Sequence, residues 1–259
     1  MAAEPIRFDN GSSYERSMGA WSRLIGEQFL DWLALDEGLR WLDVGCGTGV
    51  FSALVAELAA PAAISGVDPS AQQLAFARQR LPTGDFQEGN ALALPYADAM
   101  FDAAAMALVI AFVPEPARGV AEMARVVRPG GSIAAYMWDY GGAMPHDPVP
   151  ALAQALGATF PRPPNTAVAA IDALTSLWED AGLEDVSAVR FEVTRRFADF
   201  DDFWETTAAI ASISPMLAEL SDAQRVKLRA EVRARVADDP SGGVSRTAGV
   251  NAVKGRVPR

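Results

Sequence analysis

Short apolar runs alternate with segments of helical periodicity through the first half of the chain, and this alternation limits the possible fold more than any other feature. Runs typical of buried strands lie at 41–44, 63–68, 101–108 and 132–138, and a further short strand is expected at 85–87. Between these runs, apolar residues recur every three or four positions, as they do along one face of a helix. Strands that alternate with helices predict a largely parallel sheet with helices on both faces.

The second half of the chain adds two strands and a long helical segment. Alternating polar and apolar residues at 189–193 predict a half-exposed strand, and 244–257 predicts a last, less regular strand. Apolar stripes and a capping serine, Ser221, predict that 199–237 is helical. The expected fold is therefore one α/β domain with a sheet of seven strands.

The charge balance and the scarcity of two residue types exclude several chemistries. The 33 acidic and 22 basic residues give a net charge of −11, which disfavours binding to the phosphate backbone of a nucleic acid. A single cysteine and a single histidine cannot form a disulfide or a Cys- or His-based metal site. Because we find neither a long apolar stretch nor a secretory signal, we expect a cytoplasmic protein with no membrane span.

The glycine loop after the first strand is the most informative motif. Asp43–Gly49 ends a strand and opens a helix, and Asp68 ends the next strand. Glycines at such a turn let a ligand approach the backbone at a helix N-terminus. A carboxylate at the end of the second strand can accept hydrogen bonds from ribose hydroxyls. The motif therefore predicts a ligand that contains a nucleoside.

Dinucleotides and P-loop nucleotides fit this loop poorly. The G-x-G-x-x-G pattern places Val50 or Ser52 where the third glycine should be, and no Lys-Ser or Lys-Thr pair follows. Asp43, directly before the loop, is a poor neighbour for a pyrophosphate but suits a ligand with an ammonium group. An NAD-dependent oxidoreductase and a non-catalytic nucleoside-binding module remain the alternatives.

The glycine loop and the signals that follow it resemble class I S-adenosylmethionine-dependent methyltransferases. These signals are, in order, Asp43–Gly49, Val67–Ser70, Gly89–Ala91 with Leu94-Pro95, Phe101-Asp102 and Arg128–Gly131. A weaker match at Tyr14–Ser22 resembles the N-terminal lid of the ubiquinone/menaquinone-biosynthesis-like branch, which acts on small molecules. The resemblance implies a Rossmann-like sheet whose last strand is antiparallel, with helical lid additions.

The resemblance also implies roles around the cofactor S-adenosylmethionine and its product S-adenosylhomocysteine. Gly45 and Gly47 would line the methionine part, with Asp43 near its ammonium group. Asp68 would bind the ribose. Asn90 stands where many relatives have an aspartate that faces the adenine amino group, although it also suits a plain turn. The other cofactor contacts expected are Cys46, Gly49, Pro69, Ala91, Leu92, Met106, Ala107 and Tyr14.

The acceptor pocket is expected at the same edge of the sheet. His146 lies in a loop rich in Pro and Gly after the fifth strand and is a candidate general base, although a solvated loop histidine is the commoner case. No metal is expected, because transfer from a sulfonium needs mainly alignment and exclusion of water. The apolar pocket residues expected are Trp21, Trp138, Phe203 and Trp204.

These observations predict an enzyme that transfers a methyl group from S-adenosylmethionine to a small, apolar organic acceptor at carbon, oxygen or nitrogen, by in-line displacement. We expect a monomer or homodimer that acts on a small molecule and not on nucleic acid. One methyltransferase domain should span 1–259. Its expected parts are an N-terminal helical lid at 1–38, a cofactor-binding core at 39–140, a substrate-side loop, helix and strand at 141–197, a helical insert or cap at 198–240 and a final strand at 241–259.

Overall fold

The computed structural model describes residues 18–240 and 242–259, and within them seven strands form one sheet. The order across the sheet is β3-β2-β1-β4-β5-β7-β6. Strand β7 pairs antiparallel with both β5 and β6, and the pairs formed by β1 to β5 are parallel. The predicted Rossmann-like sheet with an antiparallel last strand is therefore confirmed. The strands are β1 (Arg40–Val44), β2 (Ala63–Asp68), β3 (Asp85–Glu88), β4 (Phe101–Ala107), β5 (Val127–Trp138), β6 (Glu184–Phe197) and β7 (Val244–Arg256).

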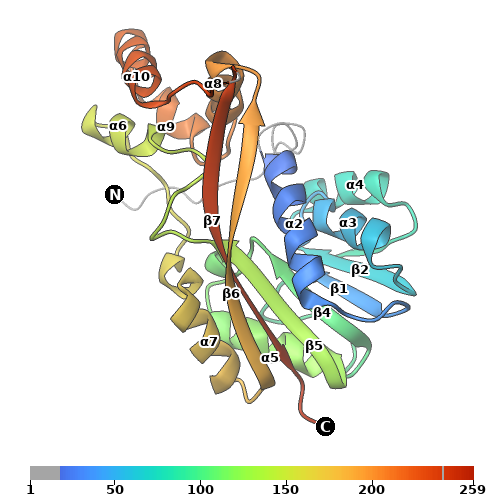
Figure 1. Ribbon diagram of the computed structural model, residues 1–259. Coiled ribbons are helices and arrows are strands. Elements are labelled where there is room, and N and C mark those ends of the chain that lie inside the picture. The colour runs from blue at the N-terminus through green and yellow to red at the C-terminus, as the bar shows by residue number, and fades with distance from the viewer. Residues whose placement is uncertain (1–17, 241) are drawn as a thin grey trace.

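Helices cover both faces of the sheet, as Figure 1 shows. On one face lie α2 (Ala20–Leu33), α3 (Val50–Leu58) and α4 (Ala71–Arg80). On the other lie α5 (Pro116–Val126) and α7 (Ile171–Asp180). A strand covered on both faces has no solvent-facing side, so its sequence is a continuous apolar run. This explains the central strand β4, in which Ala103, Ala104 and Ala105 are all buried.

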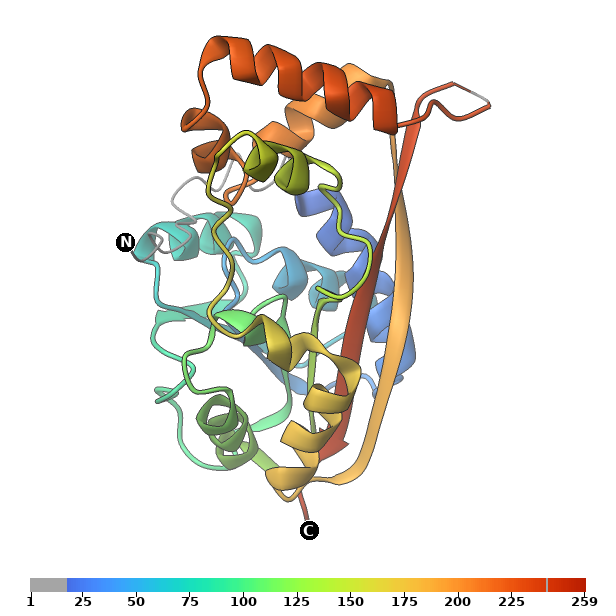
Figure 2. The same cartoon turned by 90° about the vertical axis from the view of Figure 1, so that its left-hand side faces the viewer.

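A long two-stranded ribbon carries a helical cap beyond the end of β5. Strands β6 and β7 pair as far as Phe197 opposite Val244, whereas β5 ends at Trp138, opposite Val250. The part of the ribbon from Val250 back to Val244, together with its partners in β6, therefore extends past the end of β5. Four helices gather around this overhang in both views (Figures 1 and 2). They are α6 (Val149–Ala155), α8 (Phe200–Ala208), α9 (Ser214–Ala218) and α10 (Asp222–Arg235).

The segment predicted to be helical, 199–237, forms three separate helices. Pro215 lies in the first turn of α9, where its missing N–H is not needed, but a proline cannot continue a helix from the preceding residues. Ser221 then caps α10 with the predicted capping box: Ser221 Oγ accepts from the backbone N–H of Gln224, whose side chain accepts from Ser221 N. The cap is therefore a cluster of short helices.

Strands β5 and β6 are longer than predicted. Arg128–Gly131, which precedes the strand predicted at 132–138, lies inside β5, where pairing with β4 changes register between Phe101 and Ala103. Such a bulge lets a strand continue past glycines that look like a turn. Strand β6 is an edge strand with many exposed positions. Apolar and polar residues of β6 therefore alternate clearly only at 189–193, the part that was predicted as a strand.

No helix among the described residues is long and apolar enough to cross a membrane.

The conformation of Gly49 in the glycine loop leads to a prediction about the stability of the fold. Gly49, at φ +75°, caps α3, and a Cβ there would lie 3.0 Å from Cα of Ala77 on α4. Gly38 has nearly the same φ, +74°, but a Cβ there would meet nothing within 4 Å. The left-handed conformation alone costs an alanine about 1–2 kcal/mol, and a forced shift of packed backbone costs about 1–3 kcal/mol more.

We therefore expect Gly49→Ala to lower the free energy of unfolding by about 1–3 kcal/mol more than Gly38→Ala does, measured by chemical denaturation. Equal losses in the two variants would show that α3 and α4 do not need this close approach.

Candidate functional site

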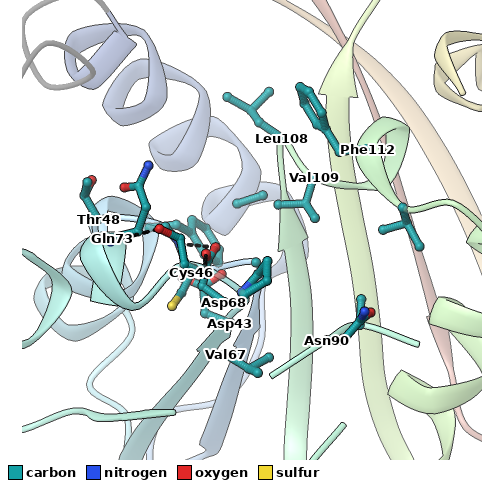
Figure 3. Close-up of a pocket in the computed structure, with 18 of the residues that line it drawn as sticks. Asp43, Cys46, Thr48, Val67, Asp68, Gln73, Asn90, Leu108, Val109 and Phe112 are labelled. Carbon is teal, nitrogen blue, oxygen red and sulfur yellow. Dashed lines mark hydrogen bonds between the residues drawn. The ribbon is translucent and has the colours of Figure 1, made fainter. Parts of the chain in front are cut away.

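A cavity of about 610 Å³ opens at the carboxyl ends of β1, β2 and β4. In an open α/β sheet, ligands bind at this edge where the strand order reverses, which here is between β1 and β4. Figure 3 shows Asp43 and Asp68 next to each other, with Leu108, Val109 and Phe112 forming a separate wall. The cavity therefore lies where the glycine motif predicts the ligand.

The glycine loop turns sharply at Gly45. Its φ is +76°, and its N–H donates to the carbonyl oxygen of Val67 at 2.7 Å. A Cβ at this position would lie 2.6 Å from the side chain of Val109, across from the loop. Glycine is therefore required here both by the backbone conformation and by the close approach of the residues after β4.

Asp43 has a buried carboxylate oxygen without a partner. The residue is only 3% exposed and lines the cavity. Its Oδ2 accepts a hydrogen bond from Ser52 Oγ at 2.6 Å, but Oδ1 has no hydrogen-bond partner among the described residues. Because a buried polar atom without a partner is costly, this oxygen is suited to a cation or a hydrogen-bond donor supplied by a ligand.

Burial raises the pKa of the Asp43 carboxyl to about 7. The hydrogen bond from Ser52 opposes this increase, and the nearby negative charge of Asp68 adds to it. The carboxyl group is thus about half protonated near neutral pH. A cation bound beside it would favour the ionised form.

Asp68 is held in place by backbone N–H groups. Its Oδ2 accepts from Gly47 N at 3.0 Å, and its Oδ1 accepts from Ser70 N at 2.9 Å. Burial raises the pKa of this carboxyl, and the two hydrogen bonds oppose the increase. Each carboxylate oxygen can accept a further hydrogen bond. Asp68 can therefore still bind two donors, such as the hydroxyls of a ribose.

Asn90 is an exposed turn residue at the margin of the cavity. Its Oδ1 accepts from the backbone N–H of Leu92 at 2.9 Å, which closes a local turn. The oxygen expected to face the adenine is thus already engaged by the chain, although it has a second lone pair.

The cavity brings most of the expected cofactor residues together. Gly49, Leu92 and Met106 are not among its lining residues. Gly49 instead faces Ala77, and the fully buried Met106 points toward Gly119 on α5. Tyr14 lies outside the described residues. The expected residues that line the cavity are Asp43, Gly45, Cys46, Gly47, Asp68, Pro69, Asn90, Ala91 and Ala107.

A second cavity of about 100 Å³ adjoins the first at the end of β5. Leu108, Phe112 and Pro163 line both cavities. The second cavity is closed by the loop after β5 and by the residues between α8 and α9. Its other lining residues are Met18, Met137, Trp138, Tyr140, Met144, Pro145, His146, Phe160, Pro161, Ile210, Ala211 and Ser212.

His146 is not a solvated loop histidine. It is 7% exposed, lines the second cavity, and has its ring centre 5.5 Å from that of Phe160. Burial lowers the pKa of the imidazole to about 4, which Asp147 opposes and Arg162 enhances. The side chain is therefore neutral at neutral pH.

The four aromatic residues expected in the acceptor pocket occupy different places. Trp138 lines the second cavity, and Trp21 packs edge-on against it at 6.0 Å between ring centres. Phe203 and Trp204 line neither cavity. Both instead pack against Phe200 within the cap.

Sequence reasoning missed Ser52, Arg162 and Tyr140. Ser52 had a usable signal, because a small polar residue on the apolar face of a helix needs a buried partner, here Asp43. Arg162 and Tyr140 lie in loops between regular elements, where periodicity carries no information about orientation.

Comparisons with known proteins agree with this geometry. The profile of a family described as a methyltransferase domain matches residues 42–135. A demethylmenaquinone methyltransferase from Renibacterium salmoninarum is 38% identical over 113 residues, which cover 44% of this chain and 45% of that protein. An uncharacterized protein from Mycobacterium bovis is 31% identical over 208 residues, 75% of each chain. The first match thus spans about half of the relative.

A solved structure of an S-adenosylmethionine-dependent methyltransferase from Thermotoga maritima has the same fold. Its TM-score is 0.57 at 20% identity, and the alignment covers 96% of this chain and 97% of that one. The chain thus contains a methyltransferase domain at 42–135 and has the fold of the class I S-adenosylmethionine-dependent methyltransferases. S-adenosylmethionine is the cofactor of this family.

The environment of Asp43 predicts an unusual titration. We expect the Asp43 carboxyl to titrate near pH 7 in the ligand-free protein, measured by carbon NMR of labelled aspartate. Ser52→Ala removes the hydrogen bond that stabilises the ionised form, so the pKa should rise further. Ser65→Ala, another buried serine, should leave it unchanged. Titration of Asp43 near pH 4 in the wild type would contradict this description of the site.

Proposed function

We propose that this protein transfers a methyl group from S-adenosylmethionine to a small organic acceptor. The observation that carries the proposal is the unpaired Oδ1 of the buried Asp43 on the cavity wall. The methionine part of S-adenosylmethionine has an α-ammonium group, which can donate a hydrogen bond to this oxygen and compensate its charge.

The other lining residues suit the remaining parts of the same ligand. A Cβ built at Gly47 would have only Gln73, at 3.9 Å, within reach, so a ligand can approach this backbone closely. Asp68 would accept hydrogen bonds from the ribose hydroxyls. Pro69 and Ala91 would pack beside the adenine, with Asn90 at its edge.

S-adenosylmethionine, when bound, supplies a methyl group that is already activated by the positive sulfonium. The chain therefore has mainly to hold the acceptor in line with that group and to exclude water. Good alignment of two reactants corresponds to about 7–11 kcal/mol of the barrier. The cap helices and the loop at 139–164 would close the acceptor side against solvent.

The proposal extends to the organisation of the whole protein. We propose one methyltransferase domain with the parts expected from the sequence, working in the cytoplasm as a monomer or homodimer. The net charge of −11 favours a small-molecule acceptor over nucleic acid.

The alternative of an NAD-dependent oxidoreductase fits the cavity less well. The pyrophosphate of a dinucleotide would lie near the carboxyl groups of Asp43 and Asp68, which lie together at the glycine loop. Like charges in a partly buried site are unfavourable.

Calorimetric titration with S-adenosylhomocysteine tests the proposal. We expect the wild type to bind, and Asp43→Asn to weaken binding at least tenfold, or by about 1.4 kcal/mol, because the carboxylate that compensates the ammonium charge is lost. Asp31→Asn makes the same change on the exposed surface of α2 and should bind like the wild type.

The proposal fails if the folded wild type does not bind S-adenosylhomocysteine, or if Asp43→Asn binds it as tightly. Binding without turnover on any acceptor would instead support the non-catalytic module.

A further inference from the structure

Strand β6 is a long strand at an open edge of the sheet. It has 14 residues, whereas β3, at the other edge, has 4. Figure 2 shows β6, in orange, along the outer side of the ribbon, and the described part of the chain places no strand beyond it. An open edge offers a row of backbone N–H and C=O groups to a further strand.

The features that usually protect an edge strand are missing from most of β6. Natural edge strands are short, interrupted by bulges, or carry proline or lysine. Strand β6 contains neither proline nor lysine, and from Ser187 to Phe197 it pairs with β7 in unbroken register. This part of the edge is therefore suited to pairing with another strand.

The bonds of β7 show which backbone groups of β6 point outward. Gly249 N donates to Ala143 O at 3.0 Å, and Gly249 O accepts from Asp139 N at 2.9 Å. Both groups of Gly249 thus point toward β5, so Glu192, which lies opposite Gly249, directs its own N–H and C=O away from β7. Gln28 Nε2 lies 3.5 Å from this carbonyl oxygen, a weak hydrogen bond that a partner strand would replace.

The residues around Phe191 make this edge complementary to itself. Because outward groups alternate along a strand, Arg190 also directs its backbone outward, as Glu192 does. An antiparallel second copy with Phe191 on the two-fold axis would place Arg190 opposite Glu192 of the partner subunit, and Glu192 opposite the partner subunit's Arg190. The two side chains form an ion pair within the chain at 2.9 Å, and with 42% and 63% of their surface exposed they can also reach a partner.

The charges at the two ends of β6 favour the same orientation. Glu184 and Asp185 begin the strand, and Arg195 and Arg196 lie near its end. Antiparallel pairing brings the acidic end of one copy beside the basic end of the other, whereas parallel pairing would bring like charges together. This charge complementarity points to a second copy of the chain as the strand that covers the edge.

Apolar side chains lie along the same edge. Phe191 and Trp32 pack edge-on at 6.0 Å between ring centres, and both are only partly buried. On the two-fold axis, Phe191 would lie opposite its copy in a pair without backbone hydrogen bonds, where side chains approach most closely. A second copy would therefore cover apolar surface as well as backbone groups.

We propose that two copies of this chain pair antiparallel along β6, with Phe191 on the two-fold axis, so that their sheets join into one. The inference goes beyond the proposed function and does not depend on methyl transfer. Because β6 and β7 carry the cap, the partner strand would also stabilise the ribbon on which the cap rests.

Sedimentation equilibrium tests the proposal. We expect the wild type to form a dimer at micromolar concentration. Glu192→Pro removes an outward N–H without removing a bond to β7, so this variant should be monomeric with an unchanged circular dichroism spectrum. Glu192→Arg places like charges opposite each other at two symmetric positions and should raise the dimer dissociation constant at least tenfold. Glu205→Arg makes the same charge change on the exposed side of α8 and should dimerise like the wild type.

Cross-linking tests the register and does not depend on the proline variant. Phe191→Cys would lie opposite its copy, so oxidised glutathione should link two chains by a disulfide. Ser187→Cys, exposed on the same strand, would lie far from its copy and should stay unlinked. The natural Cys46 is buried and serves as the background in both variants.

A wild type that remains monomeric would overturn the inference, as would a folded Glu192→Pro variant that dimerises like the wild type. Linking through Ser187→Cys but not through Phe191→Cys would overturn the pairing about Phe191. None of these results bears on S-adenosylhomocysteine binding, which tests the proposed function separately.

Discussion

A carboxyl group buried at the end of a central strand, with one oxygen unpaired, is the constraint on which this site depends. The fold places Asp43 beneath the glycine loop, where Ser52 satisfies one oxygen and leaves the other toward the cavity. Burial raises the pKa of Asp43 to about 7, so protonation offsets part of the cost in the free protein. A ligand with a positive charge would offset it better. Binding of such a ligand would therefore also remove the free-energy cost of burying the Asp43 carboxyl.

The two sides of the site come from different parts of the chain. The cofactor side consists of loops that follow β1, β2, β3 and β4, all joined to rigid parallel strands. The second cavity, on the proposed acceptor side, is lined by the loop after β5 and by residues of the cap that the overhanging ribbon of β6 and β7 supports. Such a division lets the acceptor pocket vary while the cofactor edge stays constant, which is why a fold supports many specificities.

Much of the cofactor side of the site could be predicted, because short sequence motifs at the ends of strands mark the residues that form it. Asp43, Gly45 and Asp68 lie at the ends of neighbouring parallel strands, so sequence spacing fixes their proximity. The acceptor side depends on packing between distant segments. Periodicity showed that Phe203 and Trp204 lie on a helix but not that they face the interior of the cap. Loop composition likewise gave no sign that His146 is buried, because its burial comes from Phe160 and the segment after α8.

The measurement that tests this account most directly is the number of protons released when S-adenosylhomocysteine binds at pH 6.5, from calorimetry in buffers of different ionisation enthalpy. A carboxyl with a pKa of about 7 is largely protonated at this pH, whereas an α-amino group is already charged. The account predicts net release of protons on binding in the wild type and almost none in Asp43→Asn. Binding with no proton release in the wild type would contradict it.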